Sequence, residues 1–360
     1  MAMYAEKKEM YFGKADILAE LKIEHEKLFE LLKGALDERY EKETETEDLS
    51  GIDMKYLIET ADRHSVLPFI YDFAEKSSQF DERERETVRK AALRTTMQSY
   101  RLVMLSKYLV GELSKRGIEV CVLKGAATAS FYPVPEYRKS GDVDILLTDL
   151  SKYEEAVNAL EELGFLKSKE QPALHQTVFK ADRNIDIELH TMLAEPFDNN
   201  AINRYLDKLL RGQSVRIMRA DCMGVKLPML DHAYHAFELL LHMLQHFLRA
   251  GFGLKLITDW VVFWNKVELS GEDRELFLSL VERCGIKGFS DMVTLVCCRY
   301  LGLSKERVAW MELPDNMKVE EFMVDVMEAE EFGHSDNKRM VALRGNAPGD
   351  YVREFHHQMH

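Results

Sequence analysis

The sequence predicts an α+β protein, in which a small mixed β-sheet flanked by helices lies between an N-terminal helical region and a C-terminal helical domain. Three observations lead to this prediction. Apolar residues recur at helical spacing before Gly117, short segments with strand-like alternation follow, and from Pro228 onward nearly every segment has helical spacing again. These changes divide the chain into residues 1–117, 118–227, 228–332 and a polar tail at 333–360.

The N-terminal region begins with a helix, an acidic segment and a pair of short helices. Apolar residues at helical spacing predict the first helix at Lys14–Leu36. The acidic sequence at Asp37–Asp48 is typical of a solvated helix end or a linker. Two short helices are predicted within Met54–Phe73, with a break at Pro68.

The longest predicted helix, Asp81–Lys115, leads directly into the sheet. It ends before Gly117, and the strand Ile118–Leu123 follows. Apolar residues at helical spacing form a stripe along this helix. The stripe consists of Leu93, Met97, Tyr100, Met104, Tyr108 and Leu113.

Two acidic residues alternate with apolar residues in the segment GDVDILL. Because alternate residues of a strand point to one face, Asp142 and Asp144 project together, while Val143 and Ile145 face a core. Like charges held this close repel each other, and a cation between them removes the cost. Carboxylate oxygens suit Mg²⁺ or Mn²⁺. The alternative is a strand whose carboxylates are simply solvated.

A second acidic pair occurs in the segment IDIELH. Asp186 and Glu188 share one face of a predicted strand, Ile185–Leu189. This strand forms a predicted hairpin with His175–Ala181 through a turn at Asp182–Asn184. We expect it to lie beside the strand of the first acidic pair, so that the two pairs converge.

A glycine turn precedes both acidic pairs. Lys124, Gly125 and Ala126 follow an apolar strand and open a short predicted helix, Ala126–Phe131. Small side chains let backbone N–H groups approach a phosphate, and a helix N-terminus favours negative charge. The turn therefore predicts a phosphate site near the carboxylates.

These motifs resemble the nucleotidyltransferase superfamily related to DNA polymerase β, in which a strand, Gly, small residues and a helix precede D-x-D and a later lone carboxylate. More narrowly, LKG, YP, R, GDVDILL and IELH, followed by a His-rich helix and Asp-Trp, resemble the poorly characterised bacterial nucleotidyltransferase family 5. The resemblance covers roughly residues 67–264 and implies a sheet of nucleotidyltransferase type. Two departures are Ala126, where the superfamily usually has Ser or Gly, and a longer gap from Gly125 to Asp142.

The resemblance implies transfer of a nucleoside monophosphate from a nucleoside triphosphate to a hydroxyl-bearing acceptor, with release of pyrophosphate. Asp142, Asp144 and Glu188 would hold two Mg²⁺ or Mn²⁺ ions. Glu188 is preferred as the third carboxylate because the family pattern places one two residues before the His, here His190. Asp186, which points the same way, stays the alternative.

Phosphate binding requires backbone donors and cations. Gly125 and Ala126 would supply N–H groups, and Lys124, Arg138 and Lys139 are the nearby bases. Arg138 resembles the arginine that the family has a few residues before its D-x-D, and its guanidinium suits bidentate contact with phosphate. A salt bridge to the D-x-D is the alternative for Arg138, and a surface position is the alternative for Lys124.

A His-rich helix follows the predicted sheet. Its polar residues recur on one helical face. They are His235, Glu238, His242 and His246. The spacing of His242 and His246 also occurs in zinc sites. The other interpretations are a polar wall of the cleft opposite the carboxylates, to which His190 would also belong, and buried hydrogen-bonded histidines.

Composition limits the classes of partner. The net charge of −14 argues against binding of duplex nucleic acid, and it favours a small molecule, peptide or protein over RNA as the acceptor. Five cysteines without CxxC spacing indicate reduced thiols and a cytoplasmic protein, and no apolar stretch is long enough to span a membrane. Two other function classes stay open: a phosphohydrolase with the same carboxylates, and a non-catalytic nucleotide-binding or toxin–antitoxin-type regulatory protein.

Overall fold

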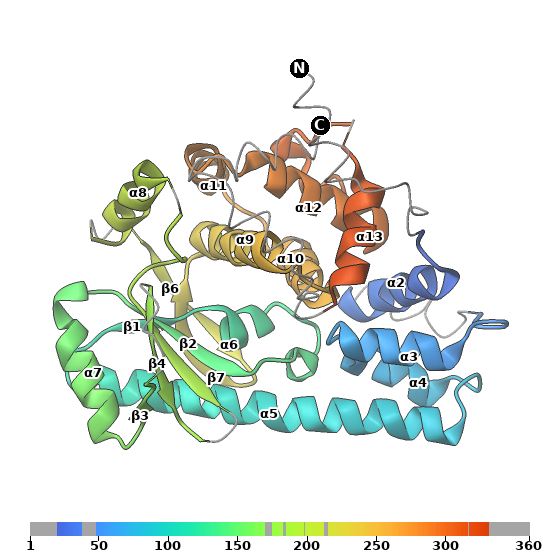
Figure 1. Ribbon diagram of the computed structural model, residues 1–360, viewed down its shortest axis with the longest axis horizontal. Coiled ribbons are helices and arrows are strands. Elements are labelled where there is room, and N and C mark those ends of the chain that lie inside the picture. Colours follow the sequence, from blue (N-terminus) through green and yellow to red (C-terminus); the bar gives the residue numbers. More distant parts are fainter. Residues whose placement is uncertain are drawn as a thin grey trace, which may run out of the picture.

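The computed structural model describes residues 20–37, 48–169, 175–182, 185–197, 199–211, 215–315 and 317–330. It confirms the predicted α+β class, because a mixed seven-stranded sheet is flanked by helices and has helical regions before and after it. Figure 1 shows the long helix α5 (Glu82–Ser114) beneath the sheet, and helices α9 (His232–Arg249) and α10 (Leu254–Lys266) above it.

Short helices precede α5. They are α2 (Ile23–Leu36), α3 (Met54–Arg63), η3 (Leu67–Ile70) and α4 (Tyr71–Lys76). The last three pack against α5, and α2 packs on α3 and η3. The short 3-10 turn η3 contains Pro68 and separates α3 from α4, so the predicted break is confirmed. Most of the acidic segment, residues 38–47, and the start of the first predicted helix lie outside the described residues.

Helix α5 begins with a capping box, in which the Asp81 carboxylate accepts from the Glu84 backbone N–H and Glu84 accepts in return. Its buried face is rich in small residues, including Ala91, Ala92 and Ser99, which allow the sheet and neighbouring helices to approach closely. The predicted apolar stripe lies mostly on the opposite face. Its first five members are 45% to 67% exposed, and only Leu113 is buried.

The strands follow the order β3-β4-β5-β2-β1-β7-β6 across the sheet. Their bounds are β1 (Val120–Val122), β2 (Asp142–Leu147), β3 (Leu166–Lys167), β4 (Gln176–Lys180), β5 (Asp186–His190), β6 (Ile217–Cys222) and β7 (Val225–Leu230). Strand β2 is antiparallel to β1 and parallel to β5. The predicted hairpin of β4 and β5 is confirmed, and β5 lies beside the D-x-D strand as expected. The second half of its turn, residues 183 and 184, lies outside the described residues.

One sheet hairpin was only half predicted. The sequence predicts a further strand at Ser214–Met218, whereas β6 begins at Ile217 and pairs with β7 across a turn at Gly224, whose φ of +78° suits glycine. Strand β7 runs through Pro228 to Leu230 and pairs with β1. The alternation of Val225, Leu227 and Met229 was too short to outweigh the proline as a strand signal.

The remaining helices complete the fold around the sheet and above it. They are α6 (Lys124–Ala129), η4 (Pro135–Tyr137), η5 (Leu150–Lys152), α7 (Tyr153–Glu162), α8 (Asn200–Arg211), α11 (Gly271–Arg283), α12 (Lys287–Tyr300), η6 (Ala309–Met311) and α13 (Val319–Ala329). Trp260, Trp264 and Phe277 pack edge-on and tilted in the helical core. Among the described residues, no helix combines the length and the apolar character that crossing a membrane requires. The predicted tail at 333–360 lies outside the described residues.

Candidate active site

The parallel pairing of β2 with β5 places the two acidic pairs next to each other. Asp142 is opposite Asp186 and Asp144 is opposite Glu188 in the register of the two strands. Because both strands alternate, the intervening Val143 and Ile187 are buried in the core. The convergence expected from the sequence therefore follows from strand register.

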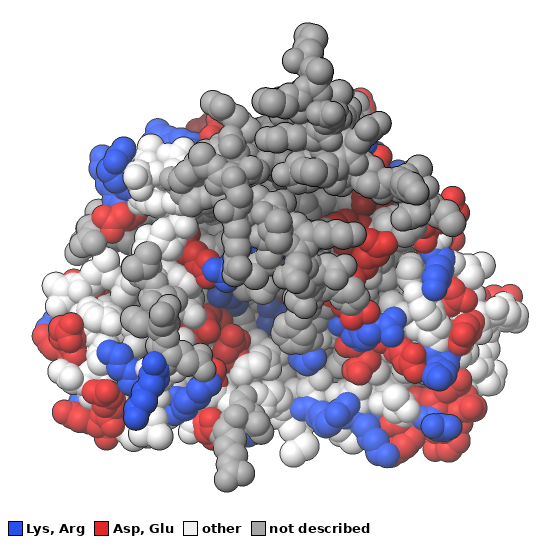
Figure 2. Space-filling view, viewed as in Figure 1, with Lys and Arg blue, Asp and Glu red and all other residues white. Residues whose placement is uncertain are grey.

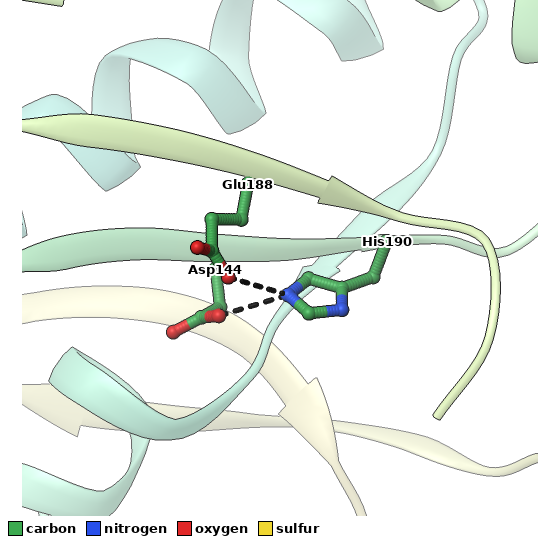
Figure 3. Close-up of side chains that lie close together, drawn as sticks. All are labelled: Asp144, Glu188 and His190. Carbon is green, nitrogen blue, oxygen red and sulfur yellow. Dashed lines mark hydrogen bonds and ion pairs between the residues drawn. The ribbon is translucent and has the colours of Figure 1, made fainter. Parts of the chain in front are cut away.

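Asp144, Glu188 and His190 form a compact cluster (Figure 3). The imidazole Nε2 of His190 lies 2.8 Å from Asp144 Oδ1 and 3.3 Å from Glu188 Oε2. One ligand atom from each of the three residues lies within 4.8 Å of the others. Asp144 and His190 are each 2% exposed. His190, expected as a member of the cleft wall, thus lies directly among the carboxylates.

Lys124 brings a positive charge to the same cluster. Its Nζ lies 3.1 Å from Asp144 Oδ1, and its side chain is 17% exposed. Lys124 has a φ of +37° and Gly125 a φ of +34°, so the chain turns sharply between β1 and the rest of α6. A left-handed lysine is strained, and such strain is typical of functional turns. A Cβ on Gly125 would also approach Ser140 Oγ to 3.4 Å.

The two aspartates of the D-x-D differ in pKa. The charge of Asp144, then burial and the charge of Glu188, raise the pKa of Asp142 to about 6. Burial alone would raise the pKa of Asp144, but the charge of Lys124 and the hydrogen bond from His190 lower it well below its ordinary value. The cluster therefore holds one firmly ionised carboxylate, Asp144, beside a second, Asp142, that gains its charge only as the pH rises through about 6.

The polar face of α9 approaches this cluster from the helical domain. Burial, then the charges of Lys124 and His246, lower the pKa of His242 well below its ordinary value, while Asp144 opposes the shift. The rings of His242 and His246 lie 4.5 Å apart. His235, further from the carboxylates, is buried and contacts Thr128 through Nε2 at 3.4 Å. The helix thus contributes largely neutral imidazoles near the carboxylates.

Glu238 belongs to the same face of α9 and is wholly buried. Neither of its carboxylate oxygens has a hydrogen-bond partner within the part of the chain that the structure describes. Burial raises the pKa of Glu238 to about 7, against an opposing effect of the Lys124 charge and a reinforcing effect of Asp144.

Arg138 lies in a second buried cluster. Its Nε and Nη2 donate to the two carboxylate oxygens of Asp259 at 2.7 and 2.8 Å, and Tyr132 donates to Asp259 Oδ1 at 2.6 Å. Its Nη1 lies 3.4 Å from the carbonyl oxygen of Gly125. The structure therefore gives Arg138 a salt bridge to α10 and a contact with the glycine turn. Lys139 donates to Ser65 Oγ at 2.8 Å.

The model of a family described as uncharacterised nucleotidyltransferases matches residues 50–302 of the chain. The chain belongs to this family. The resemblance seen in the motifs is therefore confirmed, and it extends beyond them on both sides. The match includes the glycine turn, both acidic pairs, the His-rich helix and Asp259.

A search of solved structures finds an antigenic nucleotidyltransferase-like protein from Paracoccidioides brasiliensis. The two chains share 17% sequence identity with a TM-score of 0.34, and the match covers 51% of this chain and 88% of that one. No curated protein matches the chain.

The residues of this family member fit a divalent cation. Asp144 and Glu188 offer carboxylate oxygens, and the lysine ammonium against Asp144 shows that the site attracts positive charge. Carboxylates suit Mg²⁺ and Mn²⁺, and an imidazole nitrogen is better tolerated by Mn²⁺ than by Mg²⁺. Asp186 lies one register pair away, with its carboxylate 2.7 Å from Lys180 Nζ.

Two nearby residues were not singled out from the sequence. The charge of Lys255, at the start of α10, partly opposes the raised pKa of Asp142, and after burial it contributes to the lowered pKa of His242 and His246. His175 lies with its ring 5.8 Å from that of His190. Neither belongs to a motif, and their proximity to the carboxylates depends on tertiary packing alone.

Proposed function

We propose that this protein transfers a nucleoside monophosphate from a nucleoside triphosphate to a hydroxyl-bearing acceptor and releases pyrophosphate, in a reaction that depends on Mg²⁺ or Mn²⁺. The observation that carries the proposal is the cluster of Asp144, Glu188 and His190 on two paired strands, with Asp142 two residues before Asp144 and the turn at Lys124 next to it. Membership of the nucleotidyltransferase family supports the same reaction class.

The carboxylates have a cation-binding role in this proposal. Asp142, Asp144 and Glu188 would hold the divalent cations through their carboxylate oxygens, with Glu188 as the third carboxylate. Divalent ions bound there would neutralise the charge that develops on the phosphate, and they would lower the pKa of the acceptor hydroxyl. His190 orients the carboxylates of Asp144 and Glu188 through Nε2.

The glycine turn and its neighbours have the phosphate-binding role. Backbone N–H groups of Gly125 and Ala126 face the phosphates, and Lys124 supplies a positive charge. Arg138 acts indirectly, because its guanidinium is held by Asp259 and contacts the Gly125 carbonyl oxygen. A phosphate contact for Lys139 would require its ammonium to leave Ser65.

The acceptor enters beside the polar face of α9. His242 and His246 on this face, and Lys255 at the start of α10, lie near the carboxylates. A small molecule, a peptide or a protein side chain suits the acidic chain better than RNA does. On the described part of the face in Figure 2, basic side chains are interspersed with acidic ones and form no continuous basic surface.

The test is an assay with each of the four α-labelled nucleoside triphosphates, with Mg²⁺ or Mn²⁺ and a panel of small-molecule, peptide and RNA acceptors. We expect pyrophosphate release coupled to transfer of label, both lost in the Asp142→Asn/Asp144→Asn double variant. Release of inorganic phosphate without transfer would favour a phosphohydrolase. Triphosphate binding without turnover for every acceptor would favour a regulatory protein.

A further inference from the structure

The ammonium of Lys124 and a divalent cation need the same carboxylate. Lys124 Nζ lies 3.1 Å from Asp144 Oδ1, and that oxygen also accepts from His190. A cation bound by Asp144 would place two positive charges within a few ångströms of each other in a site that is almost closed to solvent. Such charges repel at low dielectric, which favours a cation-bound state in which the Lys124 ammonium leaves Asp144 while its charge stays near the turn.

The structure contains a buried carboxylate that suits this movement. Glu238 is 0% exposed, and both of its oxygens lack hydrogen-bond partners among the described residues. Burial alone would lower the pKa of the Lys124 ammonium, but the charges of Asp144 and then of Glu238 raise it above its ordinary value. Buried carboxylates normally have partners, because an unpaired one is costly to stability.

We propose that Glu238 is a second anchor for Lys124, to which the ammonium moves from Asp144 when a divalent cation binds. Lys124 has a long flexible side chain, so its ammonium can exchange partners while its backbone stays in the turn. The exchange keeps the lysine charge paired in both states. This inference rests on the cation-dependent function proposed above, and it makes Glu238 a positioning residue that contacts neither cation nor substrate.

The test is a double-mutant cycle read out as Mn²⁺ affinity. Mn²⁺ is titrated into the full chain without nucleotide, and free Mn²⁺ is followed by electron paramagnetic resonance. We expect Glu238→Gln to weaken Mn²⁺ binding about tenfold, because Lys124 then has no second carboxylate. In the Lys124→Met background, the same substitution should change the affinity less than about twofold.

Two results would overturn the proposal. An equal loss of affinity in both backgrounds would mean that Glu238 acts on the cation directly, and no loss in either background would mean that it does not take part. Asp291→Asn is the matched control, since Asp291 is another buried helical carboxylate, paired with Lys287 away from the site. It should leave Mn²⁺ affinity unchanged even where it lowers thermal stability.

A measurement on the wild-type chain covers the case in which a variant fails to fold. The side-chain ¹⁵N signal of the Lys124 ammonium should shift on addition of Mg²⁺ and stay protected from exchange, because it remains paired. Loss of protection would contradict a second anchor. Label transfer by the wild-type chain is measured separately. Transfer without an energetic coupling of Glu238 and Lys124 in Mn²⁺ binding overturns only this inference, and such coupling without transfer overturns only the proposed function.

Discussion

Two buried acid–base clusters contact the turn at Lys124 and Gly125, and they differ in how completely their charges are paired. In the cluster of Arg138 and Asp259, both carboxylate oxygens accept from the guanidinium, and Tyr132 adds a further hydrogen bond. We call this the closed cluster. It connects the sheet region to helix α10 and leaves Asp259 little capacity for a ligand.

The open cluster is the group of Asp142, Asp144, Glu188, His190, Lys124 and Glu238. It contains polar atoms that lack partners among the described residues, namely His190 Nδ1 and both oxygens of Glu238. Incomplete pairing of buried groups lowers stability, and proteins retain it mainly where a ligand or a reaction needs the free groups. The comparison suggests that the closed cluster supports the fold and the open cluster serves the chemistry.

The largest expected effect is on stability, in the closed cluster. Arg138→Met leaves the Asp259 carboxylate buried without its counter-ion, so we expect the free energy of unfolding to fall by about 3–5 kcal/mol. Urea unfolding followed by circular dichroism measures this change. Addition of Asp259→Leu should recover part of the loss, because the unpaired charge is then removed. A loss below about 1 kcal/mol would show that the pair is not a structural element.

The open cluster should respond in the opposite direction. Burial raises the folded-state pKa of Glu238 from 4.5 to about 7, so ionisation costs stability progressively as pH rises through this window. Glu238→Gln should therefore stabilise the cation-free chain at pH 8 by about 2–3 kcal/mol and leave it nearly unchanged at pH 4.5. Unfolding curves at the two pH values check this. A destabilised variant at pH 8 would place Glu238 with the closed cluster.

Cation binding should depend on pH through the open cluster. Because the charge of Asp144, burial and Glu188 raise the pKa of Asp142 to about 6, Asp142 is largely protonated at pH 5 and ionised at pH 7. Mn²⁺ should bind about tenfold more tightly at pH 7 than at pH 5, with release of a proton. Titrations at pH 5, 6 and 7 test this, and Asp142→Asn should flatten the trend. Equal affinity at pH 5 and 7 would exclude Asp142 as the titrating ligand.

The acidic part of the open cluster could be predicted from the sequence because its signal is local. Alternation fixes the face of Asp142 and Asp144, and the hairpin places β5 next to β2. Lys124 and Glu238 stand in predicted motifs, but their pairing could not be predicted, because the contact of Lys124 with Asp144 and the lack of a partner for Glu238 depend on how α6 and α9 pack against the sheet. A motif cannot show which buried carboxylate is left without a partner.

Helix α5 shows the limit of periodicity in a different way. Its stripe of apolar residues was correctly recognised as one face, yet Met97 is 67% exposed and Ala91 on the buried face is only 5% exposed. Small residues allow close packing but carry little hydrophobic signal. The closed cluster was not predicted, because the alternatives for Arg138 were a phosphate and a salt bridge to the D-x-D. Its partner is instead Asp259, on a helix more than a hundred residues away.

The smallest expected effect is that of substituting Asp186. This residue lies near the open cluster, and the prediction is that it does not belong to it. Asp186 shares a strand face with Glu188, but its carboxylate pairs with Lys180 at 2.7 Å and is 35% exposed. Exposed pairs contribute little energy, so Asp186→Asn should change transfer rate and Mn²⁺ affinity less than about threefold. Glu188→Gln is the matched variant and should lower the rate at least about 100-fold, because Glu188 contacts His190 beside Asp144. The reverse ranking in the same transfer assay would make Asp186 the third carboxylate, and the open cluster would then extend toward the surface end of β5.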